Sequence, residues 1–230
     1  MRSVFLWLSL AAPLMAHAAV CERRAGPVPP WVVELYTSEG CSSCPPADRW
    51  LSTLTGRNDV LPLAFHVAYW DRLGWVDRFA LREFTDRQYA LARTMGARSV
   101  YTPQVVVQGQ DWRRWPALPA PAAAAPMSLN LRRDGNVVIA EVGAAPGRWS
   151  GYWAVLESGH RSRVSAGENR GETLVHDHVV RLYQPVAEWQ GAQSLTLALP
   201  PADPAHARRI VFVVTGAADL RPVQALSLDC

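Results

Sequence analysis

The sequence of 230 residues contains no lysine, so all 23 of its basic residues are arginine. Lysine forms Schiff bases with carbonyl substrates and binds phosphate in P-loops, so both kinds of chemistry are excluded. The net charge is only +3, and acidic residues interleave with the arginines, which argues against nucleic acid as a partner. The hydrophobic fraction of 49% is ordinary for a folded protein, so disorder over most of the length is excluded.

The sequence also lacks an uninterrupted apolar run of ~20 residues, so we expect no stable membrane insertion. A shorter apolar run, residues 4–15, follows Arg2 and precedes Ala16-His17-Ala18, which reads as a cleavage site. This order is typical of a secretory signal peptide. We therefore predict that residues 1–18 are removed and that the mature protein is exported, to the periplasm or beyond. Lipid attachment at Cys21 is disfavoured, because Val20 is larger than the residue such processing normally needs.

Cysteine is scarce, with four residues: Cys21, Cys41, Cys44 and Cys230. Disulfides persist outside the cytosol, and four cysteines allow three pairings. Cys41 and Cys44 form a C-x-x-C motif, which leaves Cys21 and Cys230, near the two ends, to form a structural disulfide. On the loop-entropy model that bridge would contribute up to roughly 4–5 kcal/mol. The alternative is that Cys21 and Cys230 remain two unpaired thiols.

Hydrophobic patterns in the N-terminal half predict strands that alternate with helices. Strands are expected at residues 31–36, 60–67 and 105–107, and helices at 45–54 and 83–95.

The second half has a different pattern, and the change falls at residues 116–126, which are mostly alanine and proline. Beyond them the patterns predict strands at residues 127–142, with a hairpin turn at Asp134-Gly135, and at 152–156, 194–199 and 210–215. We therefore expect a signal peptide at 1–18, a first domain at 19–115, a linker at 116–126 and a β-rich domain at 127–230.

The order of strand, C-x-x-C, helix and later Thr102-Pro103 before a strand resembles the thioredoxin superfamily, with glutaredoxin-like motif spelling. More specifically, the chain resembles an exported family, the domain of unknown function 1223 family. The stretches that carry this resemblance are residues 34–48, 63–71, 73–75, 100–104 and 167–171, with His176. The resemblance implies an α/β fold, in which a thioredoxin-like N-terminal unit precedes a β-rich C-terminal half. It also implies a cis Thr102–Pro103 bond beside the cysteine pair.

In such a site Cys41 would be the accessible thiol that attacks a partner's disulfide, and Cys44 would resolve the mixed disulfide. The positive end of a following helix would lower the pKa of Cys41. A residue before proline avoids the helical region, however, so Pro45 biases Cys44 toward extended geometry and a later helix start. Pro103 is assigned to the catalytic site, and Thr102, His66 and Trp70 to partner binding.

The leading hypothesis is therefore a periplasmic thiol–disulfide oxidoreductase that acts on protein thiols or disulfides, with no bound cofactor and no resident metal. One alternative is a copper- or zinc-handling protein that uses the same thiols with His66, His176 or His178. His176 and His178 would lie on one face of a strand, which suits a ligand pair. Another alternative is a non-catalytic binding module in which the Cys41–Cys44 disulfide is only structural.

Two further features carry open interpretations. Glu34, on the strand before the cysteines, is either a proton relay or an acid paired with arginine. The polar segment at residues 167–171 is either a simple turn or a contact in which Glu168 or Arg170 crosses the domain boundary.

Overall fold

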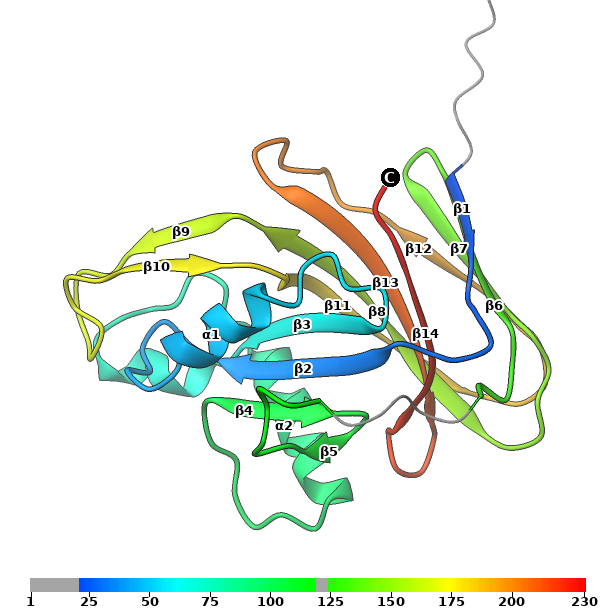
Figure 1. The fold of residues 1–230 in the computed structure, drawn as a ribbon, viewed down its shortest axis with the longest axis horizontal. Coiled ribbons are helices and arrows are strands. Elements are labelled where there is room, and N and C mark those ends of the chain that lie inside the picture. The colour runs from blue at the N-terminus through cyan, green and yellow to red at the C-terminus, as the bar shows by residue number, and fades with distance from the viewer. Residues whose placement is uncertain (1–20, 119–123) are drawn as a thin grey trace, which may run out of the picture.

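The computed structural model describes residues 21–118 and 124–230, which Figure 1 shows as a ribbon. The predicted signal peptide, residues 1–18, lies outside the described residues, as do residues 119–123 of the predicted linker. Among the residues described, no helix has the length and apolar character needed to cross a membrane.

The first half contains two parallel strands joined through a helix. β2 (Trp31–Thr37) and β3 (Val60–His66) pair along their whole length, and α1 (Pro45–Ser52) connects them. Nearly every residue of both strands is buried, which explains their apolar sequence. The chain continues through η1 (Ala68–Leu73), α2 (Arg82–Thr94), β4 (Gln104–Val107) and β5 (Gln110–Asp111). The five predicted elements of this half are confirmed to within two residues at each end.

The second half is built from longer antiparallel strands, which divide between three sheets (Figure 1). The largest sheet takes β8 (Trp149–Ser158), β11 (Val179–Trp189), β13 (Ala207–Gly216) and β14 (Pro222–Leu228). A four-stranded sheet contains β1 (Cys21–Arg24), β6 (Leu129–Asp134), β7 (Val137–Val142) and β12 (Gln193–Ala198). A separate hairpin pairs β9 (His160–Arg163) with β10 (Thr173–His176). The four-stranded sheet packs on β8, β13 and β14 over a core that includes Leu131, Trp153 and Phe212.

The expected α/β fold with a thioredoxin-like N-terminal unit is wrong. Of the described residues, 44% lie in strands and 13% in helices. The strands of the two halves also share one sheet, in the order β14-β13-β8-β11-β3-β2-β4-β5. The two halves join where β11 runs parallel to β3, with Val179 opposite Ala64, and the Ala64 N–H donates to the His178 carbonyl at 2.8 Å. An unpaired strand edge is a liability, and β11 covers the edge of β3.

Candidate functional site

The cysteine pair lies in the loop that leaves the carboxyl end of β2. A disulfide joins Cys41 to Cys44, as predicted, and Cys44 caps the N-terminus of α1. The expectation that Cys44 is extended is wrong, since its φ of −78° and ψ of −35° are helical and α1 begins at Pro45. The N–H groups of Ala47 and Asp48 both donate to the Cys44 carbonyl, which holds the residue in the first turn. The second predicted disulfide, between Cys21 and Cys230, is also present.

A buried ion pair lies beside this loop, between His66 at the end of β3 and Asp77 after η1. His66 Nδ1 is 2.7 Å from Asp77 Oδ2, and both side chains are fully buried. Asp77 also accepts the N–H groups of Glu39 and Phe79 at 2.8 and 2.9 Å. Burial alone would raise the pKa of Asp77, but the charge of His66 and these hydrogen bonds lower that pKa to about 2. Burial would lower the pKa of His66, yet the charge of Asp77 outweighs it and raises that pKa.

The second histidine of this cluster, His176, comes from the far end of β10. Its Nε2 atom lies 3.2 Å from Glu39 Oε1, an ion-pair distance without the alignment of a hydrogen bond. Trp75 Nε1 donates to Glu39 Oε2 at 2.8 Å. The two imidazole rings of His66 and His176 meet edge to face, with centroids 5.0 Å apart. In the described part of the chain, His66 Nε2 and both ring nitrogens of His176 have no hydrogen-bond partner.

Asp48 adds a third buried carboxylate, one helical turn after Cys44 on α1. Its Oδ2 atom accepts a hydrogen bond from Thr37 Oγ1 at 3.2 Å. Burial raises the pKa of Asp48, and the charges of His176 and His66 oppose that rise. A cavity of about 110 Å³ between α1 and β10 is lined by Asp48 and His176, among others, which connects this side of the cluster to solvent.

Of the predicted binding residues, Trp70 and Thr102 meet directly. Trp70 Nε1 donates to Thr102 Oγ1 at 2.8 Å. The predicted cis bond between Thr102 and Pro103 is confirmed. Gly40, in the cysteine loop, lies so close to Trp70 that a Cβ at Gly40 would be 3.1 Å from Trp70 Cβ. Trp70 thus bridges the cysteine loop and the Thr102–Pro103 segment.

A loop from the second half closes over the cysteines. Asn169 Nδ2 donates to the carbonyls of Glu39 and Cys41, at 2.8 and 3.0 Å. Glu168 Oε2 accepts the N–H and the hydroxyl of Ser42, at 3.1 and 2.8 Å. The contact across the two halves is therefore confirmed for Glu168, whereas Asn169 was missed. The accessibility expected for Cys41 is not found, because Cys41 and Cys44 are both 0% exposed.

Three further residues considered from the sequence are Glu34, His176 and His178, and the structure settles the interpretation of each. Glu34 is paired with Arg87 on α2, which confirms the arginine-paired interpretation. The expectation that His176 and His178 share one face of a strand is wrong. β10 ends at His176, and His178 has a φ of 57° and faces Thr55 Oγ1 at 2.9 Å. Within residues 21–118 and 124–230, no group of three or more His, Cys, Asp or Glu side chains is arranged to hold a metal.

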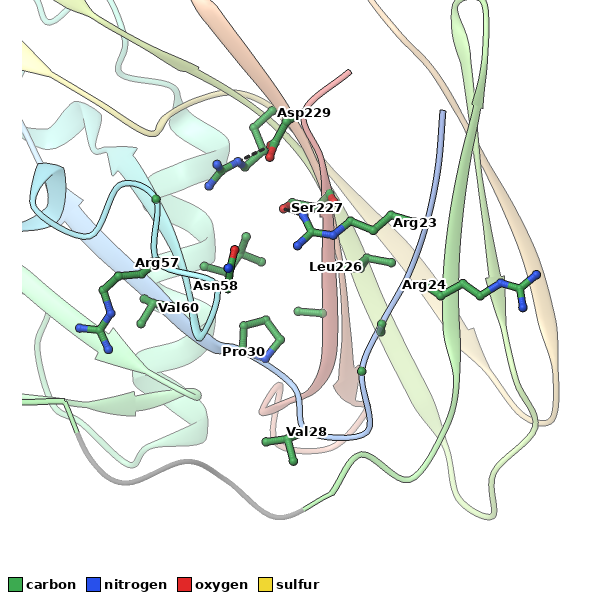
Figure 2. Close-up of a pocket in the computed structure, with 16 residues that line it drawn as sticks. Arg23, Arg24, Val28, Pro30, Arg57, Asn58, Val60, Leu226, Ser227 and Asp229 are labelled. Carbon is green, nitrogen blue, oxygen red and sulfur yellow. Dashed lines mark hydrogen bonds and ion pairs between the residues drawn. The ribbon is translucent and has the colours of Figure 1, made fainter. Parts of the chain in front are cut away.

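A larger cavity, of about 350 Å³, lies at the opposite ends of β2 and β3, where Pro30 and Val60 line it (Figure 2). Arginine is its main polar component, but Arg209 is paired with Asp229 at 2.6 Å, and Figure 2 shows Arg24 pointing away from it. The side chain of Arg23 points inward and donates to the Ser227 carbonyl at 3.2 Å. Cys41 and Cys44 are not among the described residues that line this cavity, so it is separate from the cysteine site.

Comparison with known proteins gives a family and a fold. The family described as "Protein of unknown function (DUF1223)" matches residues 32–215. Protein AGR_C_4864 from Agrobacterium tumefaciens is similar in structure, with a TM-score of 0.66 and 26% identity over 89% of this chain and 96% of that one. HBP35 of Porphyromonas gingivalis has a TM-score of 0.58 and 14% identity over 88% of this chain and 75% of that one, which shows a shared fold alone. No curated protein matches the sequence.

Proposed function

The chain belongs to the DUF1223 family, and we propose that this member is an exported thiol–disulfide oxidoreductase that acts on protein thiols or disulfides through Cys41 and Cys44. One observation carries the proposal: the disulfide adjoins a buried cluster of titratable groups with unpartnered ring nitrogens. A disulfide that only braces a fold needs no such neighbours, whose burial costs free energy. Perturbed acids and bases gathered beside a reactive group are typical of functional sites.

The exchange starts from the disulfide form. A partner thiolate attacks Sγ of Cys41, the Cys41–Cys44 bond breaks, and Cys44 leaves as a thiolate that takes up a proton. The partner's second thiolate then attacks its own sulfur in the mixed disulfide, and Cys41 leaves and is protonated. The partner loses two electrons and two protons, and the cysteine pair gains both. The reverse sequence reduces a partner's disulfide.

Two features support this chemistry at the cysteine loop. The positive end of α1 adjoins Cys44 and favours a thiolate there. Asp48 lies one turn along the same helix, where its Oδ2 accepts from Thr37. Helical side chains lean toward the N-terminus, which places Asp48 on the Cys44 side of its turn. The cavity lined by Asp48 and His176 gives protons a route to solvent. Asp48 is therefore the carboxylate we assign to proton exchange with Cys44.

We also propose that the cysteine loop and its neighbours, but not the fold as a whole, resemble the corresponding site of the thioredoxin-like superfamily. The shared features are the C-x-x-C motif at the start of a helix and the Thr102–Pro103 segment, which Trp70 ties to the loop. We also propose that the protein works in the periplasm, where its predicted export would place it and where disulfides persist.

A redox titration of the mature protein tests the function. Purified protein is equilibrated in thiol–disulfide buffers, free thiols are alkylated, and peptide mapping follows Cys41–Cys44 separately from Cys21–Cys230. We expect Cys41–Cys44 to titrate between about −120 and −270 mV, the range of exchange catalysts, while Cys21–Cys230 stays oxidised as an internal reference. A Cys41–Cys44 potential below about −300 mV is that of a structural disulfide and would contradict the proposal.

Trapping separates the roles of the two cysteines. Cys44→Ser leaves the attacking thiol without its resolving partner, so it should accumulate mixed disulfides with proteins. Cys41→Ser should not. Equal trapping by both variants would contradict the assignment of Cys41 as the attacking thiol.

A further inference from the structure

The cysteine pair is buried in the state described, although the serines between the two cysteines are not. Cys41 and Cys44 are both 0% exposed, while Ser42 and Ser43 lie at the surface. Exchange needs in-line approach of a partner sulfur to Sγ of Cys41, so some part of the molecule has to move first. The segment that is hydrogen-bonded to the Cys41 carbonyl and to Ser42 connects β9 to β10 and contains residues 167–171, which we name the cap loop.

The cap loop is held to the cysteine loop by few polar contacts. Asn169 Nδ2 bridges the carbonyls of Glu39 and Cys41, and Glu168 Oε2 accepts both donors of Ser42. Asn169 is the one buried residue among residues 167–171. The side chains of the loop supply no apolar anchor, although its Gly167 backbone lies against Trp75, where an added Cβ would be 3.2 Å from Trp75 Cβ. Segments with few buried side chains open at low free-energy cost.

The backbone of the cap loop supports movement as a unit. Gly167 and Gly171 bound it, and both have positive φ, 74° and 92°, which favours glycine. At its base the Gly171 N–H donates to the Val164 carbonyl at 2.9 Å, and the Val164 N–H donates to the Glu172 carbonyl at 3.0 Å. These bonds stay within the β9–β10 connection, so the tip can leave the cysteine loop without breaking them.

The contact between Glu168 and Ser42 indicates what replaces the cap. A carboxylate accepts two hydrogen bonds from Ser42, close to the positive end of α1, and these bonds lower the pKa of Glu168. Charge-assisted bonds of this kind are stronger than those between neutral groups. The position therefore favours an acidic side chain over a neutral one, whichever chain supplies it.

We propose that the cap loop is displaced during exchange and that the partner is a protein thiol whose neighbouring acidic side chain takes the place of Glu168 on Ser42. The inference rests on the proposed function and adds to it a partner class. The cap loop then occupies the partner's position whenever no partner is bound.

The first test measures how fast dithiothreitol reduces Cys41–Cys44 in the oxidised mature protein, followed by alkylation and peptide mapping. Glu168→Ala and Asn169→Ala should each speed reduction about tenfold, because each removes hydrogen bonds that hold the cap. Glu168→Gln, which keeps an acceptor but no charge, should fall between the wild type and Glu168→Ala. The matched control is Arg170→Ala, in the same loop, whose side chain makes no hydrogen bond or ion pair within the described residues.

The second test uses two reduced synthetic peptides that differ only in a glutamate or glutamine beside their single cysteine. In Glu168→Ala, the glutamate peptide should form the mixed disulfide several-fold faster than the glutamine peptide. Equal rates would overturn the acidic partner class. Melting temperatures and the Cys21–Cys230 disulfide are checked in every variant, so that a folding defect is recognised.

The two tests distinguish a result that contradicts the proposed cap loop from one that contradicts the proposed oxidoreductase function. Wild-type dithiothreitol rates in Glu168→Ala and Asn169→Ala, with the fold intact, would overturn the cap whatever the peptides do. Faster dithiothreitol reduction in these variants supports the cap. If neither peptide then forms a mixed disulfide with any variant, the cap stands and the proposed oxidoreductase function, with its partner class, is overturned.

Discussion

Two buried charged clusters lie on either side of β2, and they satisfy their polar atoms very differently. In the first, Glu34 on β2 accepts hydrogen bonds from Tyr36 and Tyr152 at 2.6 and 2.7 Å and forms a salt bridge with Arg87 on α2. Arg87 also donates to Tyr183 at 3.1 Å. Both carboxylate oxygens of Glu34 are used, and four elements from both halves of the chain are tied together.

The second cluster, formed by Glu39, Asp48, His66, Asp77 and His176, is incompletely satisfied. A buried donor or acceptor that lacks a partner costs about 1–3 kcal/mol, so this cluster is retained at a cost that the first avoids. It is also the cluster beside the disulfide. The first cluster ties the two halves together, and the incomplete satisfaction of the second supports the proposed role of the cysteine loop, since functional sites are where local rules of polar satisfaction are broken.

The largest effect should come from breaking the first cluster. Arg87→Met leaves Glu34 buried without its counter-charge, so we expect a loss of about 3–5 kcal/mol in the free energy of unfolding. Urea denaturation measures it. Arg82→Met is the matched control: Arg82 is on the same helix, its side chain is 93% exposed, and its pair with Asp86 spans 3.9 Å, so the loss should be under about 1 kcal/mol. Similar losses in the two variants would show that the first cluster contributes little.

The His66–Asp77 pair should give a smaller effect that depends on pH. The pKa of Asp77 is lowered from 3.8 to about 2, so the pair stabilises the fold fully between pH 3.8 and 6.5 and loses this contribution as pH falls toward 2. The pKa of His66 is raised above its ordinary 6.5, so the pair also loses stabilisation as the pH rises above 6.5 and His66 gives up its proton. Asp77→Asn should therefore lose about 2 kcal/mol near neutral pH.

The measurement for Asp77→Asn is urea denaturation across the pH range, beside the wild type. The difference between the two proteins should shrink as the pH approaches 2, where Asp77 is protonated in the wild type. A difference that does not depend on pH would mean that shape, and not charge, makes the contribution of Asp77.

Local patterns predicted the elements around the cysteines but not the sheet that unites the halves. β2 and β3 are apolar runs that any buried strand would show, and Pro45 marks the start of α1. β11 was missed because its middle residues are largely exposed and only its ends are buried, so it shows no apolar run. Its pairing with β3 joins residues over 100 positions apart, and no local signal encodes such a contact.

The candidate site was predictable to the same degree. The cysteine pair and the Thr102–Pro103 segment carry motifs, and His66 ends a recognisable strand. Asp77 lies in no motif, and Asn169 lies in the 167–171 stretch without a signal that separates it from its neighbours. Each is defined by what it meets across the fold: His66 for Asp77, and the Cys41 carbonyl for Asn169.

Substitution of Asp48 should have the smallest effect on stability. It should also distinguish the two clusters most clearly, because it is expected to change the exchange rate more than the stability. Burial raises its pKa above the ordinary 3.8, so the folded state disfavours the charged form and loses stability as pH rises through that range. Asp48→Asn removes this cost while its side-chain oxygen still accepts from Thr37, so the variant should be slightly more stable than the wild type near pH 7. Near pH 3 the two should be equal, because Asp48 is then protonated in both folded and unfolded wild type.

Exchange by Asp48→Asn should slow by about tenfold or more, since general acid–base groups typically contribute 10²–10⁴-fold and water in the adjoining cavity replaces part of the role. Unfolding by urea and disulfide transfer to a peptide thiol are measured on the same samples. A gain in stability together with a loss of rate separates Asp48 from Arg87, where substitution costs stability and leaves the cysteine chemistry untouched in molecules that remain folded. If Asp48→Asn were less stable and equally fast, Asp48 would belong with the structural cluster, and proton exchange at Cys44 would have to use His176, the imidazole that lines the same cavity.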